Sequence, residues 1–159
     1  MASQDRALRD HLLGLLEGRN AHVAFEDAVA GIPAKVRGRT PAGAAHSPWQ
    51  IIEHLRLAQW DILEFSRNSK HASPEWPAGY WPATEAPPRR TSWNESIASF
   101  QADLRAMKKI AARSDLYARI PHGQGQTLLR EVLVLADHNA YHLGELVVVR
   151  RLLGAWKKS

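Results

Sequence analysis

Residues 127–154 read TLLREVLVLADHNAYHLGELVVVRRLLG and form the longest stretch of helical periodicity in the chain. Apolar residues recur there at spacings of three and four, which is typical of one face of a helix. Gly154 closes the stretch, as a glycine just after the last helical residue commonly does. The stretch therefore predicts one long helix from about Thr127 to Leu153.

Three segments upstream show the same periodicity, and no segment alternates with the period of a strand. They run from about Gln4 to Glu17, from Ser47 to about Ser66, and from Ser92 onward. The second and third each open with a serine followed three residues later by glutamine or glutamate, which is the signature of a capping box. Four helices joined by loops predict an all-α protein with the architecture of a four-helix bundle.

The composition is that of an ordinary globular protein, with 45% apolar and 23% charged residues. A length of 159 residues is enough for one hydrophobic core, so we expect residues 1–159 to form a single domain. The chain has no cysteine. This excludes disulfides, thiolate metal sites, iron–sulfur clusters and a cysteine nucleophile, and it leaves nitrogen and oxygen atoms to bind any metal.

The net charge of +5 raises the question of a nucleic-acid partner. The basic residues come in scattered pairs at what we expect to be surface positions: Arg89-Arg90, Lys108-Lys109, Arg150-Arg151 and Lys157-Lys158. Because there is no long basic run and no nucleic-acid-binding motif, we expect no nucleic-acid partner. The rival interpretation is a basic helical protein whose histidines are incidental, and it predicts salt-dependent DNA binding that a chelator leaves unchanged.

Neither end of the sequence suggests a membrane protein. Charges at Asp5, Arg6 and Arg9 stand where a signal peptide would need an apolar core. The longest strongly apolar stretch, Leu146–Val149, is too short to cross a bilayer. We therefore expect a cytoplasmic protein with no membrane partner.

Two histidines lie four residues apart in the last predicted helix. His138 and His142 stand about 40° apart around the helix axis and one turn apart along it, so both rings can reach one ion. Glu145 lies on the same, otherwise largely apolar face. The alternative is a pair of hydrogen-bonded core histidines. The spacing resembles the HExxH helix of zinc proteases, but Asn139 stands where that mechanism needs its glutamate, so we do not expect such a protease.

A third histidine projects from the second predicted helix. His54 shares its face with Ile51 and Ala58, which are core-like residues. A lone histidine in that position is more often structural than a ligand. Together with His138 and His142, however, it would complete a facial three-histidine site, which leaves coordination positions open for water and substrate as catalytic metal sites do.

Two segments of the chain resemble the signature helices of the DinB/YfiT-like superfamily of metal-dependent proteins. They are residues 46–55, HSPWQIIEHL, and residues 127–154. In that family the first metal histidine follows a Ser/Pro-Trp helix start, which points to His54. The other two form an HxxxHxGE/Q pattern, which points to His138 and His142 with the following Gly144-Glu145.

The resemblance implies an up-down-down-up four-helix bundle that holds one divalent metal ion, with zinc or nickel favoured over iron or manganese. It also implies a small-molecule substrate and a homodimer. Three neutral histidines leave the ion its full double charge, so it can polarise a substrate oxygen or thiolate. A metal-dependent hydrolase fits, and so does a thiol-dependent transferase or isomerase with a low-molecular-weight thiol as partner. The alternative is a non-catalytic metal- or ligand-binding stress-response bundle.

Several other side chains carry weaker predictions. Glu145 either orients a ligand or pairs with an arginine at the bundle wall, and Asp61 either accepts an imidazole N–H or faces solvent. His122 lies on a loop and either reaches the mouth of the site or is exposed. The remaining histidines are expected at the surface: His11, His22, His46 and His71.

Aromatic residues suggest two further features. The loop Trp76–Pro82 could cover the metal pocket, but we expect its aromatic rings mainly to pin the long connection to the bundle. The expected homodimer draws support from a tryptophan-rich helical surface, unless the side chains all face inward: Trp49, Trp60, Trp93 and Trp156.

Overall fold

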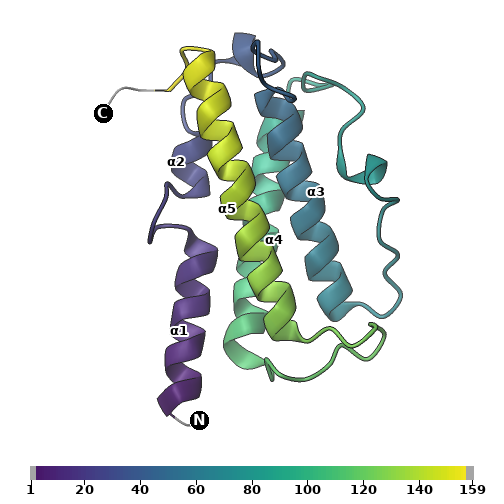
Figure 1. The fold of residues 1–159 in the computed structure, drawn as a ribbon. Helices are drawn as coiled ribbons and strands as arrows, with labels where there is room; N and C mark the ends of the chain where they lie inside the picture. Colours follow the sequence, from purple (N-terminus) through teal and green to yellow (C-terminus); the bar gives the residue numbers. More distant parts are fainter. Residues whose placement is uncertain (1–2, 157–159) are drawn as a thin grey trace.

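The computed structural model describes residues 3–156, which form helices joined by loops (Figure 1). The helices are α1 (Ser3–Glu17), α2 (Phe25–Val29), α3 (Pro48–Arg67), α4 (Ser92–Arg113) and α5 (Leu128–Leu152), with the 3₁₀ turns η1 (Ala34–Val36) and η2 (Ala78–Tyr80). Within this part of the chain there is no strand, only an isolated bridge between Arg119 and Thr127. The all-α prediction is therefore confirmed. No helix among the described residues is both long and apolar enough to cross a membrane.

The four long helices lie side by side, with the short α2 above the end of α1 (Figure 1). In that view α1 and α5 run upward, whereas α3 and α4 run downward. α3 packs against both α4 and α5. Because α3 and α4 run in the same direction, the chain has to return along the bundle between them. Residues 68–91 make this crossover along the outer side of α3.

α3 begins at the predicted capping box. The Ser47 hydroxyl accepts the N–H of Gln50, and the Gln50 side chain accepts the N–H of Ser47 at 2.9 Å. Ser47 is fully buried, and its hydroxyl donates to the Glu85 carbonyl oxygen of the crossover at 2.5 Å. One side chain therefore fixes the first turn of α3 and the end of the crossover beside it.

The capping box predicted at the start of α4 is wrong. Ser92 is the first residue of the helix, and Thr91 occupies the N-cap position. Thr91 has φ −85° and ψ −23°, and its side chain caps no backbone N–H. A capping side chain normally acts from an extended backbone, so the local sequence does not define this start. Burial of Ser92 and Trp93 against the bundle does so instead.

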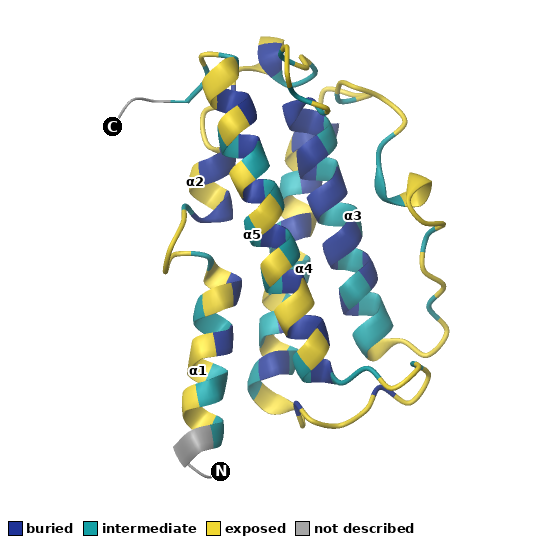
Figure 2. Cartoon of the chain, viewed as in Figure 1, coloured by how far each residue is buried: buried dark blue, intermediate teal, exposed yellow. Residues whose placement is uncertain are grey.

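Two apolar clusters fill the bundle, and a polar layer lies between them. Buried residues follow the inward faces of the helices in both halves (Figure 2). In the layer, Gln59 has no exposed surface and donates from Nε2 to the Phe100 carbonyl oxygen at 2.5 Å. Its Oε1 accepts from Asn139 Nδ2 at 3.1 Å. Asn139 lies next to His138 in the chain, so this layer is at the height where α5 carries its histidines.

Arg150, which we expected at the surface as one of a basic pair, is buried with 3% of its area exposed. Its guanidinium donates to the carbonyl oxygens of Ala28, of Ala30 at 2.9 Å and of Ala155 at 2.8 Å. These oxygens lie near the ends of two helices, where carbonyl groups lack helical partners. The prediction is wrong because tertiary packing brings those acceptors to the arginine, and Arg150 thereby ties α2 and the residues after α5 together.

The predicted tryptophan-rich surface does not form. Trp49 and Trp93 are 4% and 3% exposed and pack in the core. Trp60 and Trp156 are partly buried, and Trp156 lies against the guanidinium of Arg150 at 4.7 Å. The side chains are used for internal packing, so the tryptophans give no support to a dimer.

Candidate metal centre

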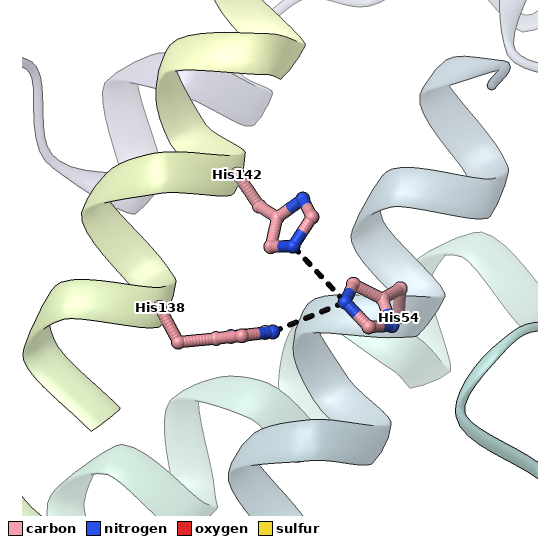
Figure 3. Close-up of side chains that lie close together, drawn as sticks. All are labelled: His54, His138 and His142. Atoms are coloured by element: carbon pink, nitrogen blue, oxygen red, sulfur yellow. Dashed lines mark hydrogen bonds between the residues drawn. The ribbon is translucent and has the colours of Figure 1, made fainter. Parts of the chain in front are cut away.

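Three histidines from α3 and α5 meet in the middle of the bundle (Figure 3). His54, in the second turn of α3, is 4% exposed, and its ring faces α5. His138 and His142 project toward it from successive turns of α5. His54 Nε2 lies 3.0 Å from Nε2 of His138 and 3.1 Å from Nε2 of His142. The predicted convergence of the three imidazoles is confirmed.

The other ring nitrogens decide the tautomer of two of these histidines. His54 Nδ1 lies 2.8 Å from the Tyr80 carbonyl oxygen, so it carries the proton that it donates. His142 Nδ1 lies 2.8 Å from Glu145 Oε2 and donates in the same way. A ring that carries its single proton on Nδ1 presents Nε2 as a lone pair. Two lone pairs that face each other across 3.1 Å repel unless a positive charge lies between them.

The arrangement fits a divalent metal ion. In a tetrahedral site with Zn–N bonds of about 2.0–2.1 Å, the ligand nitrogens stand roughly 3.3 Å apart, close to the spacings seen here. Imidazole is a good ligand for zinc and nickel, and ligating histidines usually donate their second N–H to a carbonyl or carboxylate. Unlike Nδ1 of His54 and His142, Nδ1 of His138 is buried and has no hydrogen-bond partner among the described residues. That the three residues hold an ion stays a prediction.

Burial favours the neutral form of two of the three histidines. It lowers the pKa of His138 to about 4, and the neighbouring His142 and His54 add to the effect. Burial also lowers the pKa of His54, although the hydrogen bond to the Tyr80 carbonyl opposes this shift. Since a histidine binds metal only in its neutral form, His54 and His138 are ready to accept a cation at neutral pH.

Residues 18–146 match the family model of the DinB superfamily, a range that includes all three histidines. The chain belongs to the DinB superfamily. None of the curated proteins and none of the solved structures matches it. Membership of the superfamily and the buried three-histidine cluster together fit a metal-binding bundle.

In this DinB-superfamily protein, Glu145 orients one of the three histidines. Its Oε2 accepts from His142 Nδ1, and its Oε1 accepts from His46 Nδ1 at 3.0 Å. Burial alone would raise the pKa of Glu145, but the hydrogen bonds from His142 and His46 outweigh it and the pKa is lowered. Of the two roles considered for Glu145, its contacts match the one that orients a ligand, not the pairing with an arginine.

His46, which we expected at the surface, is only partly exposed and packs against other residues. Its side chain is 29% exposed, and its ring stacks on Trp81 with centroids 3.8 Å apart. His46 lies just before the cap of α3, and Glu145 and Trp81 come from distant parts of the chain. No local pattern around His46 signals either partner, because both are brought to it by the path of the crossover.

The aromatic loop both covers the histidines and pins the crossover. Trp81 stacks face to face on His54, with centroids 3.9 Å apart and the ring planes 2° from parallel. The Tyr80 hydroxyl donates to Asp61 Oδ2 at 2.7 Å. Trp76, by contrast, is 77% exposed. Trp81 thus closes one side of the His54 ring, and Tyr80 attaches the loop to α3.

Of the two alternatives for Asp61, the structure shows the one in which it accepts an imidazole N–H. The donor, however, is not one of the three clustered histidines. His71 Nε2 donates to Asp61 Oδ1 at 2.7 Å. The His71 side chain is 6% exposed, so the expectation of a surface position is wrong for this residue. Both side chains are largely buried because the crossover folds back on α3, a contact that the sequence of either segment does not show.

The other histidines lie away from the cluster. His122 is exposed, and its Nε2 donates to the Phe65 carbonyl oxygen at 2.7 Å, so it holds the loop before α5 rather than reaching the site. His11 and His22 are exposed, as expected.

Proposed function

We propose that this chain is a metal-dependent enzyme that acts on a small molecule, with His54, His138 and His142 as ligands and zinc or nickel as the favoured ion. The observation that carries the proposal is the pair of Nε2 atoms, on His54 and His142, that face each other across 3.1 Å. A carbonyl and a carboxylate hold the Nδ1 protons of the same rings, so these rings cannot relieve the contact by exchanging tautomers. A bound cation relieves it.

The ligand set supports catalysis rather than a purely structural role. Three protein ligands leave part of the coordination sphere of zinc free, which is the arrangement of catalytic sites. When bound, the ion would supply a Lewis acid for a substrate oxygen or thiolate. Beside the cluster, the Glu145 carboxylate accepts from His46 Nδ1, an arrangement in which His46 Nε2 could serve as a general base. Hydrolysis fits this set, as does transfer or isomerisation that uses a low-molecular-weight thiol.

A second candidate is a non-catalytic bundle that a metal stabilises. The enclosure of His54 supports it, since this side chain is 4% exposed and carries the Trp81 ring on one face. A structural ion would tie α3 to α5 at the polar layer, where apolar packing is interrupted. The two candidates share the ligands and differ in whether the loaded protein turns over a substrate.

The metal site is tested first, on protein purified without a histidine tag or a nickel column. Elemental analysis and zinc titration after chelation should give one equivalent for the wild type. We expect His138→Ala or His142→Ala to abolish tight binding and His54→Ala nearly to do so, because two imidazoles rarely hold a divalent ion against water. His11→Ala, an exposed histidine of α1, is the matched control. If all three single-histidine variants keep one tightly bound equivalent, the proposed site is wrong.

Catalysis is tested on the same proteins. The loaded wild type is assayed with p-nitrophenyl esters for hydrolysis, and with glutathione plus an aryl chloride for thiol transfer. Turnover that disappears on chelation and in His138→Ala supports the enzyme. A large fall in melting temperature on chelation, without turnover of either kind, favours the metal-stabilised bundle instead.

We also propose that the chain forms a homodimer through the solvent-facing side of α5. This side carries exposed apolar residues at helical spacing in place of the tryptophans first considered: Val134, Tyr141, Val148 and Leu152. Tyr141 is 73% exposed and meets the ring of His142 edge to face at 4.9 Å, which would place a second subunit beside the histidines. Sedimentation should show a dimer that Val148→Asp dissociates. A wild type that is monomeric at micromolar concentration refutes the proposal.

A further inference from the structure

Asp61 joins two side chains of the crossover to α3. Its Oδ1 accepts from His71 Nε2, and its Oδ2 accepts from the Tyr80 hydroxyl, each at 2.7 Å. The side chains of His71 and Asp61 are only 6% and 12% exposed. Burial, reinforced by Asp61, raises the pKa of Tyr80 to about 12, so its hydroxyl keeps the proton that it donates. Both carboxylate oxygens are thus occupied by groups from a segment outside the four-helix bundle.

Tyr80 connects this cluster to the three histidines. Its hydroxyl is bound to Asp61, while its backbone carbonyl oxygen accepts the Nδ1–H of His54 at 2.8 Å. Asp61 and His54 lie seven residues apart on α3, which places them on the same face and about two turns from each other. Tyr80 therefore spans two fixed points of one rigid helix, so the position of its carbonyl follows from the position of its ring.

Trp81, the residue after Tyr80, restricts the orientation of the His54 ring plane. Trp81 lies parallel to the His54 ring at 3.9 Å and is itself stacked on the opposite side by His46. The Tyr80 carbonyl selects the tautomer of His54, and the Trp81 ring limits the rotation of its plane. Among the described residues, no other hydrogen bond is made to His54 Nδ1.

We propose that Asp61, His71 and Tyr80 form a clamp that holds residues 71–81 against α3 and positions His54 for metal binding, so that metal binding and clamp closure stabilise each other. The inference rests on the proposed metal site. None of the three clamp residues is a ligand; they are positioning residues that act through the Tyr80 carbonyl and the Trp81 ring. Because coupling between two sites is reciprocal, a clamp that raises metal affinity must in turn be tightened by the metal.

The test uses Tyr80→Phe, which removes one hydroxyl, with His71→Gln and Asp61→Asn as further variants. Tyr117→Phe and His11→Gln are matched controls, since both residues are exposed and lie outside the clamp. Zinc affinity is measured by competition with a chromophoric chelator, and helix content by circular dichroism. We expect the clamp variants to bind one equivalent of zinc about 10–100-fold more weakly than the wild type, as loss of an outer support of a ligand typically does. The controls should match the wild type.

Two measurements show whether a loss of zinc affinity arises because the clamp no longer positions His54. In the zinc-free protein, ¹⁵N spectra of the histidine rings should show His54 protonated at Nδ1 in the wild type and mixed between tautomers in Tyr80→Phe. Hydrogen exchange of residues 71–81 should slow when zinc binds to the wild type, and slow less in the variant. If Asp61→Asn does not fold, Tyr80→Phe decides alone, because it leaves the carboxylate and its partner His71 in place.

The outcomes separate this inference from the metal proposal. Unchanged zinc affinity in Tyr80→Phe, with His54 still protonated at Nδ1, overturns the clamp and leaves the three-histidine site intact. A wild type that binds no zinc overturns the metal site and the coupling with it. The tautomer measurement on zinc-free protein then still shows whether the clamp orients His54.

Discussion

Glu145 touches two histidines with one oxygen each, which makes it the most informative single residue outside the ligands. Glu145→Gln keeps the size of the side chain but replaces one acceptor oxygen by an N–H₂ donor, so the N–H of His142 or of His46 loses its acceptor. We expect zinc affinity to fall about 10–100-fold while one equivalent still binds. Glu17→Gln, at an exposed position of α1, is the control. A loss as complete as that of His142→Ala would mean that Glu145 is itself a ligand.

Acid should destabilise the metal-free protein because two buried histidines, His138 and His54, have lowered pKa values. His138 has a pKa of about 4 in the fold, against about 6.5 in an unfolded chain. The unfolded chain therefore binds more protons between these values, so stability is full above about pH 6.5, falls as the pH drops and levels off below about 4. The lowered pKa of His54 acts in the same direction. Thermal melting of chelated protein across this range measures the slope, which His138→Gln should reduce. A melting temperature that rises between pH 7 and pH 5 contradicts the prediction.

At the scale of elements, the start of α3 depends on one hydroxyl. Ser47→Ala removes the acceptor of the Gln50 N–H and the donor to the Glu85 carbonyl oxygen. Loss of an N-cap costs about 0.5–2 kcal/mol, and we expect a fall in the free energy of unfolding toward the upper end because Ser47 is fully buried. Urea denaturation of the wild type and the variant measures this change in the free energy of unfolding. Ser99→Ala, at an exposed position within α4, should change stability by less than about 0.5 kcal/mol. Equal effects of the two substitutions would show that the cap is not what stabilises α3.

At the scale of the whole molecule, the polar layer lies between two apolar clusters. Gln59→Met preserves length but leaves the Asn139 amide without its acceptor and removes the side-chain donor to the Phe100 carbonyl oxygen, which keeps its helical hydrogen bond. A buried unpaired group costs about 1–3 kcal/mol, so we expect a loss of about that size in the free energy of unfolding. Gln101→Met, on the partly exposed side of α4, is the control. A variant as stable as the wild type would mean that the layer contributes specificity rather than stability.

The local sequence determined the helices and the three clustered histidines. Periodicity sets which face of each helix is buried, and the Ser47 cap fixes where α3 begins, so both are encoded by residues a few positions apart. His138 and His142 share a face because they lie one turn apart, which holds whatever the helix packs against. At Thr91 the same reasoning failed, because the start of α4 is set by packing and not by a cap.

Only the tertiary structure decided what surrounds the histidines. His46, His71 and Trp81 lie in loops, where no periodicity reports direction or burial, and their partners on the helices are 10 or more residues away in the sequence. Whether such a side chain is exposed or packed depends on the path of the crossover along α3. That path is fixed by many weak contacts made at once, so no short pattern in the chain encodes it.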